Sequence, residues 1–202
     1  MIFNTMGEIW AVILAAGESK RMGSPKMLLP FNGSTMIECV IANVTKSDAD
    51  KIIVVLGAEK EALIQLTGKW HIEYCYNENY KEGMLSSVQC GFKNLPPGCK
   101  ASLVFQGDQP LITYITINTV INAYISSEKG IVIPVYRDKR GHPILIDMKY
   151  RNDIDKLSRD KGLRSLAYKF AADVFEVETD ESGILRDFDT YEQYKKGINL
   201  IK

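Results

Sequence analysis

The sequence predicts an α/β fold of three layers, in which crossover helices cover both faces of a mostly parallel sheet. Short runs of β-branched and other apolar residues alternate along the chain with longer segments whose apolar residues recur at helical spacing. Several runs are apolar throughout, which is typical of parallel strands that are buried on both faces. A basic turn between two later runs predicts a small β-hairpin region in addition.

The first predicted strand covers residues 9–14, and small residues at positions 15–17 follow it directly. Small side chains let a ligand approach the backbone, and successive N–H groups in such a turn form a concavity that binds anions. Arg21 and Lys26 add two full positive charges close by. The spacing of the glycines and the lysine fits neither the Walker A motif nor the glycine-rich dinucleotide motif. This stretch therefore predicts a polyphosphate site of another kind.

The elements that follow are predicted in order along the chain. A helix begins after Thr35, because Thr35 and Glu38 have the spacing of a capping box ahead of an apolar face. The other predicted elements are a strand at 52–56, a helix near 62–66, a strand at 72–76, a helix from 85 to 95, a strand at 101–106, a helix over 112–125, a hairpin of residues 131–136 and 144–146, an edge strand at 174–178 and a helix from 191.

Asp108 follows the strand that is predicted at residues 101–106. In open parallel sheets, ligands bind beyond the carboxyl ends of the strands, so the loops after this strand and after the first strand are expected to share one crevice. A carboxylate that faces a polyphosphate is repelled unless a cation lies between them, and Mg²⁺ prefers one or two carboxylates together with phosphate oxygens. Asp108 is therefore expected to hold Mg²⁺. The alternative is that Asp108 only shapes a turn before Pro110.

Residues 14–30 resemble a signature of the molybdenum-cofactor nucleotidyltransferase family (MobA-like NTP transferases), which reads LAAGxSxRMGxxKxLLP. Further matches are the GDQP motif at 107–110, the GHP motif at 141–143 and a closing DxDT motif. In this last motif the chain has Phe188 and Tyr191 where the family has isoleucine and proline. The resemblance implies the family's fold, which is the nucleotide-diphospho-sugar transferase fold, a GT-A-like Rossmann variant.

The resemblance also implies which residues act. Arg21, Lys26 and Asp108 are expected to be catalytic, and Asp108 is expected to share the metal ion with Asp189. The acceptor side is expected to include Arg140, Gly141 and His142. The residues expected to bind the nucleotide are Leu14, Ala15, Ala16, Gly17, Arg21, Lys26, Asn77, Gly83, Ser86, Ser87 and Gly107.

Ordinary structural roles remain open for several of these residues. Ser86 and Ser87 lie in the first turn of a predicted helix, where hydroxyl groups commonly cap the backbone. Asp189 and Thr190 precede the last predicted helix, and either is well suited to capping it. The charged turn at 137–143 is either a solvated hairpin tip or a clamp for an anionic acceptor.

The resemblance implies the transfer of CMP from CTP to the phosphate of molybdopterin, with release of pyrophosphate. Because no Ser-His-Asp or Cys-His arrangement can be proposed, such a reaction depends on positioning and charge neutralisation for in-line attack at the α-phosphorus. CTP is favoured because the family's cytidylyl branch has alanine at the position of Ala16. A molybdenum hydroxylase apoenzyme is a further expected partner. The alternatives are a cytidylyltransferase for a sugar or polyol phosphate, and a non-catalytic nucleotide-binding maturation partner of a molybdenum hydroxylase.

The composition predicts a single domain over residues 1–202, since 202 residues with 46% hydrophobic content can bury a full core. Basic and acidic residues number 25 each, so neither nucleic acid nor a membrane surface is favoured as a partner. No apolar stretch reaches transmembrane length. The four cysteines and two histidines lack the spacing of a zinc site, and they predict a cytoplasmic protein with reduced thiols.

Overall fold

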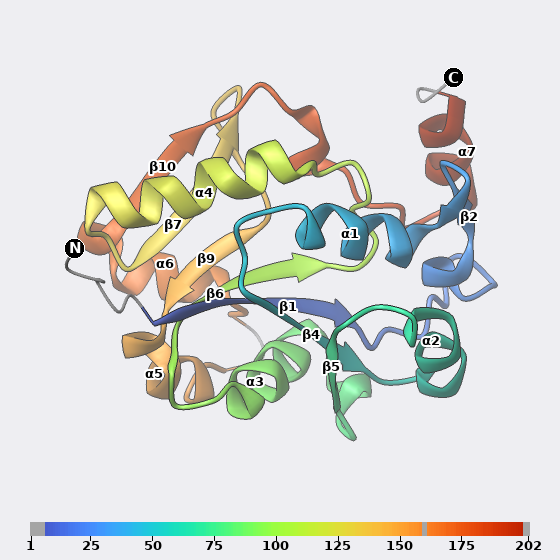
Figure 1. Ribbon diagram of the computed structural model, residues 1–202, viewed down its shortest axis with the longest axis horizontal. Coiled ribbons are helices and arrows are strands. Elements are labelled where there is room, and N and C mark those ends of the chain that lie inside the picture. Colours follow the sequence, from blue (N-terminus) through green and yellow to red (C-terminus); the bar gives the residue numbers. More distant parts are fainter. Residues whose placement is uncertain (1–6, 159–160, 200–202) are drawn as a thin grey trace.

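The computed structural model describes residues 7–158 and 161–199, in which a mixed sheet is flanked by helices (Figure 1). The strand order is β10-β7-β9-β6-β1-β4-β5, and β8 pairs with β7 beside this path. The strands of this sheet are β1 (Glu8–Ala15), β4 (Lys51–Leu56), β5 (Glu73–Tyr76), β6 (Cys99–Gln106), β7 (Ile131–Tyr136), β8 (Lys139–Arg140), β9 (Ile144–Asp147) and β10 (Val174–Glu178). A separate two-stranded ribbon consists of β2 (Pro30–Phe31) and β3 (Ser34–Thr35).

The central strand β1 is parallel to both of its neighbours, β4 and β6. At the two edges, β5 is parallel to β4 and β10 is parallel to β7. Between these groups β9 runs antiparallel to β6 and to β7. The prediction of a mostly parallel α/β sheet is therefore confirmed, and so are the hairpin and the edge strand. Both strands of the hairpin belong to the main sheet, where they separate β10 from the parallel core.

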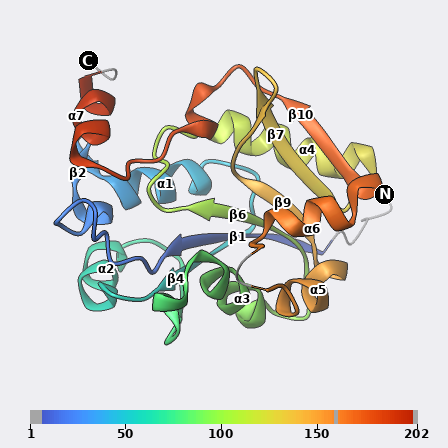
Figure 2. The same ribbon diagram turned by 180° about the vertical axis from the view of Figure 1, so that it is seen from behind.

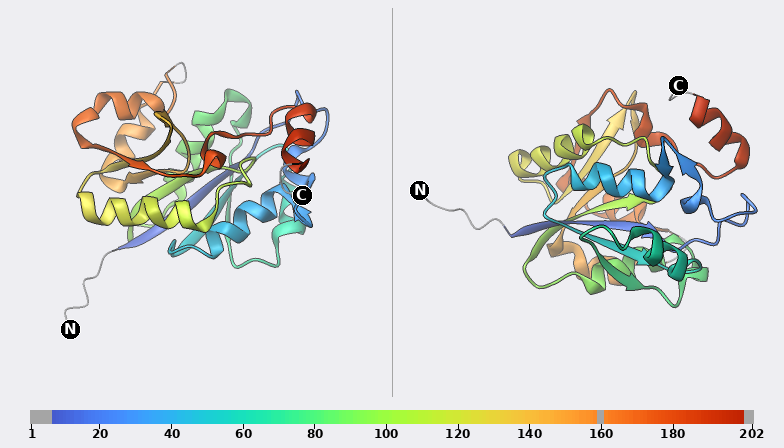
Figure 3. Two further views of the ribbon diagram at one scale, coloured as in Figure 1. Left: turned by 90° about the horizontal axis from the view of Figure 1, so that it is seen from above. Right: turned by 45° about the vertical axis from the view of Figure 1, so that its right-hand side comes forward.

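Helices cover both faces of the sheet (Figures 2 and 3). One layer packs on the side of β1 that carries Ala11 and Ile13, and the other packs on the side that carries Val12 and Leu14. The first layer consists of α1 (Met36–Thr45), α2 (Lys60–Thr67) and α4 (Tyr114–Ser127). The second layer consists of α3 (Met84–Asn94), α5 (Arg151–Asp155) and α6 (Arg164–Lys169). Burial of both faces explains why β1 is apolar along almost its whole length.

The helix boundaries follow from local chemistry. At the start of α1, the Glu38 carboxylate accepts hydrogen bonds from the Thr35 backbone N–H (3.2 Å) and the Thr35 hydroxyl (2.7 Å), as the capping-box spacing predicts. At the start of α4, the Thr113 hydroxyl accepts from the Ile115 N–H at 3.2 Å. The five-residue helix α5 was not predicted, because one turn of helix leaves no periodic pattern in the sequence.

The last helix, α7 (Tyr191–Asn199), lies beside β2 at the end of the molecule where β1 ends (Figure 1). The Phe188 ring packs 5.5 Å from the Phe31 ring, and the Tyr194 hydroxyl donates to the Pro30 carbonyl oxygen at 2.5 Å. These contacts bring the segment before α7 next to the loop that follows β1. Within residues 7–158 and 161–199, no helix has the length and apolar character needed to cross a membrane.

Candidate active site

The loops after β1 and β6 meet at the carboxyl end of the sheet. Leu14 and Gln106 are partners across the two strands, and the Gly107 N–H donates to the Leu14 carbonyl oxygen at 3.0 Å. The loops border a cavity of about 270 Å³. The predicted residues in its wall are Leu14, Ala16, Gly17, Arg21, Lys26, Gly83, Ser87, Asp108 and Asp189. The expectation that the two loops share one crevice is therefore confirmed.

Close backbone packing fixes the small-residue loop after β1. A Cβ atom on Gly57 would lie 2.3 Å from the Ala16 carbonyl oxygen, so only glycine fits beside this loop. The Ala58 N–H donates to the same oxygen at 3.2 Å. Ala15 and Gly107 are buried and do not line the cavity. These two predicted nucleotide contacts therefore support the cavity wall from behind.

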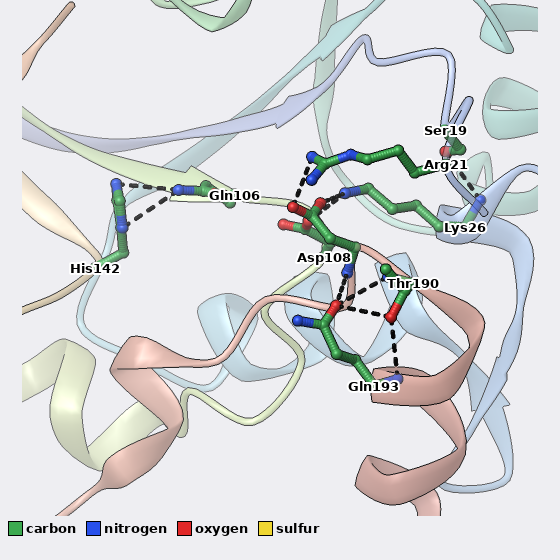
Figure 4. Close-up of polar contacts among 9 residues, drawn as sticks. Ser19, Arg21, Lys26, Gln106, Asp108, His142, Thr190 and Gln193 are labelled. Atoms are coloured by element: carbon green, nitrogen blue, oxygen red, sulfur yellow. Dashed lines mark hydrogen bonds and ion pairs between the residues drawn. The ribbon is translucent and has the colours of Figure 1, made fainter.

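Lys26 connects the two loops. Its backbone N–H donates to the Ser19 hydroxyl at 3.1 Å, which folds the intervening segment back toward β1. Its ammonium group contacts the Asp108 carboxylate and lies 3.0 Å from an oxygen of Asp189 (Figure 4). Burial disfavours the charge on Lys26, but the two carboxylates outweigh this effect and raise its pKa above the ordinary value. Lys26 is thus a protonated lysine held between two anions.

Arg21 contacts one of these carboxylates, that of Asp189. Its Nη2 atom lies 2.7 Å from the second oxygen of Asp189, and its side chain is 73% exposed. Burial alone would raise the pKa of Asp189, but the hydrogen bonds and charges of Lys26 and Arg21 lower it. Asp189 is therefore ionised at neutral pH, and Arg21 keeps room to turn toward a ligand in the cavity.

Thr190, rather than Asp189, caps α7. The Thr190 hydroxyl accepts from the Gln193 N–H at 3.3 Å, while the Gln193 side-chain oxygen accepts from the N–H groups of Asp189 (3.0 Å) and Thr190 (2.9 Å) (Figure 4). This reciprocal arrangement holds the backbone of Asp189 and leaves its carboxylate free for the two cations. The open question of which residue caps the helix is decided by these contacts.

Asp187 is a cavity residue that the sequence reasoning missed. Burial raises its pKa, and the negative charges of Asp189 and Asp108 raise it further. The neighbouring Phe188 is buried against Phe31, so Asp187 and Asp189 are left to face the cavity on either side of it. The Asp-Phe-Asp pattern, with one apolar residue between two carboxylates, was the signal that could have identified it.

Asn77 and Ser86 form the support of the opposite wall. The buried Asn77 amide donates to the hydroxyls of Ser86 (2.9 Å) and Ser87 (3.0 Å), and the Ser86 hydroxyl reaches the Gly83 carbonyl oxygen at 2.8 Å. Gly83 has φ of 101°, a conformation that favours glycine. Of this group only Gly83 and Ser87 line the cavity, so Asn77 and Ser86 join β5 to α3 behind the wall.

A second cavity of about 310 Å³ adjoins the first and shares Met84 and Gln106 with it. The predicted acceptor-side residues Arg140, Gly141 and His142 line this second cavity. The Gln106 amide nitrogen lies 3.4 Å from His142 Nδ1 (Figure 4). Burial lowers the pKa of His142 to about 4, so the imidazole is neutral at pH 7.

The walls of the second cavity are mainly apolar. Its rim carries cations, of which Arg140 forms an ion pair with Glu176 at 2.5 Å, while Lys161 and Arg164 are exposed. The apolar residues are Met84, Val88, Val104, Ile131, Ile133, Ile144, Ile146, Leu163, Leu166 and Ala167. They come from β6, β7, β9, α3 and α6 and from the turn before α6.

The first cavity offers carboxylates for a divalent cation. Among the described residues, no cluster of three or more His, Cys, Asp or Glu side chains forms a ready metal site. Asp108 and Asp189 nevertheless converge on one cationic group, the ammonium of Lys26. Burial, followed by the charges of these two carboxylates, raises the pKa of the nearby Asp187. Mg²⁺ is commonly bound by one or two carboxylates, with phosphate oxygens completing its coordination shell. The residues present therefore fit a hard divalent ion that arrives with a phosphate ligand.

Comparison with known proteins places this geometry in a family. The sequence matches the model of the MobA-like NTP transferase domain over residues 11–174. The molybdenum cofactor cytidylyltransferase of Escherichia coli (strain K12) is 27% identical over 192 residues, which cover 94% of this chain and 95% of that protein. Nicotine blue oxidoreductase of Paenarthrobacter nicotinovorans is 28% identical over 200 residues, with coverage of 92% and 94%.

Solved structures agree with the fold. Rv0371c from Mycobacterium tuberculosis H37Rv superposes with a TM-score of 0.86 at 25% identity, covering 96% of this chain and 98% of that one. A structure of the same mycobacterial protein in complex with manganese gives a TM-score of 0.82 at 24% identity, with coverage of 96% and 98%. The three-layer α/β fold expected from the sequence is therefore confirmed by solved relatives as well as by the sheet itself.

Proposed function

The chain belongs to the MobA-like NTP transferase family and is a nucleotidyltransferase, and we propose that it transfers CMP from CTP to the phosphate of a molybdopterin-type acceptor. Pyrophosphate leaves in this reaction. The observation that supports the proposal most strongly is the meeting of Arg21 and Lys26 with Asp108 and Asp189 in one cavity. Phosphoryl-group chemistry needs opposite charges placed around one phosphorus atom, and this cavity gathers them.

The proposed roles of the cations follow from their positions. Lys26 is protonated and only slightly exposed, so its charge is weakly screened and acts strongly on a phosphate nearby. Arg21 is exposed at the mouth and can turn to the outer phosphates. The backbone of the small-residue loop at Ala16 and Gly17 lines the same space. Together they would hold the triphosphate for in-line displacement and offset negative charge that develops in the transition state.

Asp108 and Asp189 are the residues that would hold Mg²⁺, with Asp187 close by. A bound divalent ion would neutralise the phosphate oxygens at the reacting centre. The mycobacterial relative in complex with manganese supports a divalent ion in this family. The contacts of Lys26 with both carboxylates fix their positions in the cavity.

The second cavity supports a pterin-type acceptor over a sugar or polyol phosphate. Its apolar walls offer surface to a flat heterocycle and few side-chain partners to a set of hydroxyl groups, which would be costly to bury without hydrogen bonds. Lys161 and Arg164 at the rim suit an anionic group on the acceptor. Gln106 and Met84 border both cavities, so an acceptor in the second would meet a nucleotide in the first.

CTP is proposed as the donor because Ala16 lines the nucleotide cavity and the E. coli relative is a cytidylyltransferase. A molybdenum hydroxylase apoenzyme is the proposed recipient of the product. Because one relative of similar identity is named an oxidoreductase, the fold alone does not identify the reaction. The paired cations and carboxylates favour nucleotidyl transfer, because hydride transfer has no need of them.

The test is an assay of pyrophosphate release with Mg²⁺, molybdopterin and each of CTP, GTP and ATP, followed by mass spectrometry of the product. We expect release with CTP and a pterin cytosine dinucleotide. A nucleotide sugar, formed with sugar phosphates but not with molybdopterin, would favour the alternative cytidylyltransferase. Binding of CTP without turnover by any acceptor would favour a non-catalytic maturation partner. Oxidation of a nicotinamide cofactor without pyrophosphate release would overturn the proposal.

A further inference from the structure

Two free thiols face each other at some distance along the chain from the charged residues of the first cavity. Cys75 on β5 and Cys90 on α3 have their sulfur atoms 3.9 Å apart. A disulfide needs a sulfur separation of about 2 Å, so the two side chains would have to approach by roughly 2 Å. Neither cysteine lines the first cavity, which is proposed to bind the nucleotide, or the second cavity, which is proposed to bind the acceptor. The pair is thus a feature that the transfer reaction does not use.

The two thiols differ in accessibility and in acidity. Cys75 is buried, whereas Cys90 is half-buried and its sulfur lies 3.5 Å from the Tyr76 carbonyl oxygen at the surface. The hydrogen bond with Cys75 lowers the pKa of Cys90, burial opposes this, and the charge of Lys93 lowers it further. The same bond and burial raise the pKa of Cys75. An oxidant would therefore meet Cys90 first, and Cys75 is placed to react with the product.

The elements that carry these thiols also carry one wall of the nucleotide cavity. Cys75 lies on β5 two residues before Asn77, which directly follows the strand, and Cys90 follows Ser87 by about one helical turn on α3. The Asn77 amide joins the elements by its hydrogen bond to the Ser87 hydroxyl, which lines the cavity. A change in the distance between β5 and α3 at the thiols would therefore also displace Ser87 in the cavity wall.

Tight packing limits how α3 can respond. A Cβ atom on Gly91 would lie 2.5 Å from a methyl carbon of Val12 on β1, so the helix already sits as close to the sheet as glycine permits. Gly91 directly follows Cys90, so α3 cannot move closer to β1 when Cys90 approaches Cys75. The helix would instead shift along or across the sheet, and its first turn, with Ser87, would move with it.

We propose that Cys75 and Cys90 form a reversible disulfide that weakens nucleotide binding. A peroxide oxidises the Cys90 thiolate: the sulfur attacks one peroxide oxygen, the O–O bond breaks, and the sulfur becomes a sulfenic acid while hydroxide leaves. The Cys75 sulfur then attacks the sulfenic sulfur, an S–S bond forms, the S–O bond breaks and water leaves. A small dithiol reverses the reaction by exchange and is itself oxidised to a disulfide. Only the effect on nucleotide binding rests on the proposed function.

The first experiment tests the bond. The full-length protein is treated with one equivalent of hydrogen peroxide and analysed by intact mass and by peptide mapping without reductant. We expect the loss of two hydrogen atoms, a linked pair of peptides that contain residues 75 and 90, and full recovery with dithiothreitol. Cys90→Ser and Cys75→Ser should abolish the link. Cys39→Ser is the matched control, since Cys39 is a half-buried free thiol that bonds to the Phe31 carbonyl oxygen at 3.2 Å. Sulfinic acid at Cys90 without a link would overturn the proposal.

The second experiment tests the effect on the site. CTP is titrated calorimetrically into reduced and oxidised protein, and we expect about tenfold weaker binding in the oxidised form, a typical coupling between two sites. Reduced Cys90→Ser should bind like the reduced wild type and should be insensitive to peroxide. Equal affinity of the linked and reduced forms would overturn the regulatory role. If the reduced protein bound no nucleoside triphosphate, the proposed function would fall and this role with it, while the mass measurement would still decide the disulfide.

Discussion

Lys26 donates a hydrogen bond from its ammonium group to the carboxylate of Asp108, although 82 positions separate the two residues in the chain. Lys26 comes from the loop after β1 and Asp108 from the loop after β6, so this contact joins the carboxyl ends of two neighbouring strands. The same ammonium group contacts Asp189. Lys26 therefore lies between the two carboxylates that are proposed to hold a divalent ion.

Asp108→Asn should reduce pyrophosphate release by roughly two to three orders of magnitude, since it removes a charge at the reacting centre while keeping the side chain's size. The variant should retain the far-ultraviolet circular dichroism of the wild type. Asp138→Asn, at the exposed tip between β7 and β8, is the matched control and should leave the rate unchanged. An Asp108→Asn enzyme with the wild-type rate would remove Asp108 from the metal site.

Lys26→Met should slow turnover by roughly two to three orders of magnitude and should tighten Mn²⁺ binding in the absence of nucleotide. The second effect is expected because the methionine no longer competes with the ion for the oxygens of Asp108 and Asp189. Electron paramagnetic resonance of free Mn²⁺ during a titration measures it. Lys20→Met is the control, since Lys20 is exposed and pairs with Glu18. Unchanged or weaker Mn²⁺ affinity in the folded Lys26→Met variant would argue against a shared position.

His142 should make stability depend on pH in the acid range. Burial depresses its pKa from 6.5 to about 4, so the unfolded chain binds a proton more readily than the folded one between these values. The free energy of unfolding should therefore fall as pH decreases through this window, by roughly 1–2 kcal/mol between pH 7 and pH 5. Urea unfolding of the wild type and His142→Gln measures it, and the variant should lose this part of the dependence. His71→Gln, at an exposed site, should retain it.

Arg164→Ala should raise the KM for the acceptor about tenfold and leave the KM for CTP unchanged. Arg164 lines the second cavity and not the first, and a charge-assisted hydrogen bond to an acceptor anion is worth about this factor. The control is Lys169→Ala on the same helix, because Lys169 pairs with Asp153 at 2.7 Å and lines neither cavity. Parallel increases of both KM values would contradict the assignment of the second cavity to the acceptor.

Much of the fold could be predicted because local patterns and local chemistry agree. The alternation of apolar runs and helical periodicity identified β1, β4, β5 and β6, and the capping box located the start of α1. The insertion of β9 between β6 and β7 could not be predicted, since strand partners depend on long-range pairing. The hairpin turn is a local feature, so its two strands could be predicted from the sequence. Their position in the sheet could not be predicted.

The candidate site divides in the same way. Lys26, Asp108 and Asp189 could be proposed because each sits in a recognisable motif, and the structure brings their side chains together. Asn77 and Ser86 were expected at the nucleotide but are buried behind the wall, where they bond to each other. The apolar second cavity could not be predicted, because its lining comes from segments that are far apart in the chain.

Gln106 and Met84 border both cavities, whereas Ala16 faces only the first and Leu163 only the second. On the proposed assignment, with the donor in the first cavity and the acceptor in the second, donor preference and acceptor preference can change by separate substitutions, with two exceptions. A replacement at Gln106 or Met84 changes the lining of both cavities at once. These two positions are where the evolution of one specificity constrains the evolution of the other.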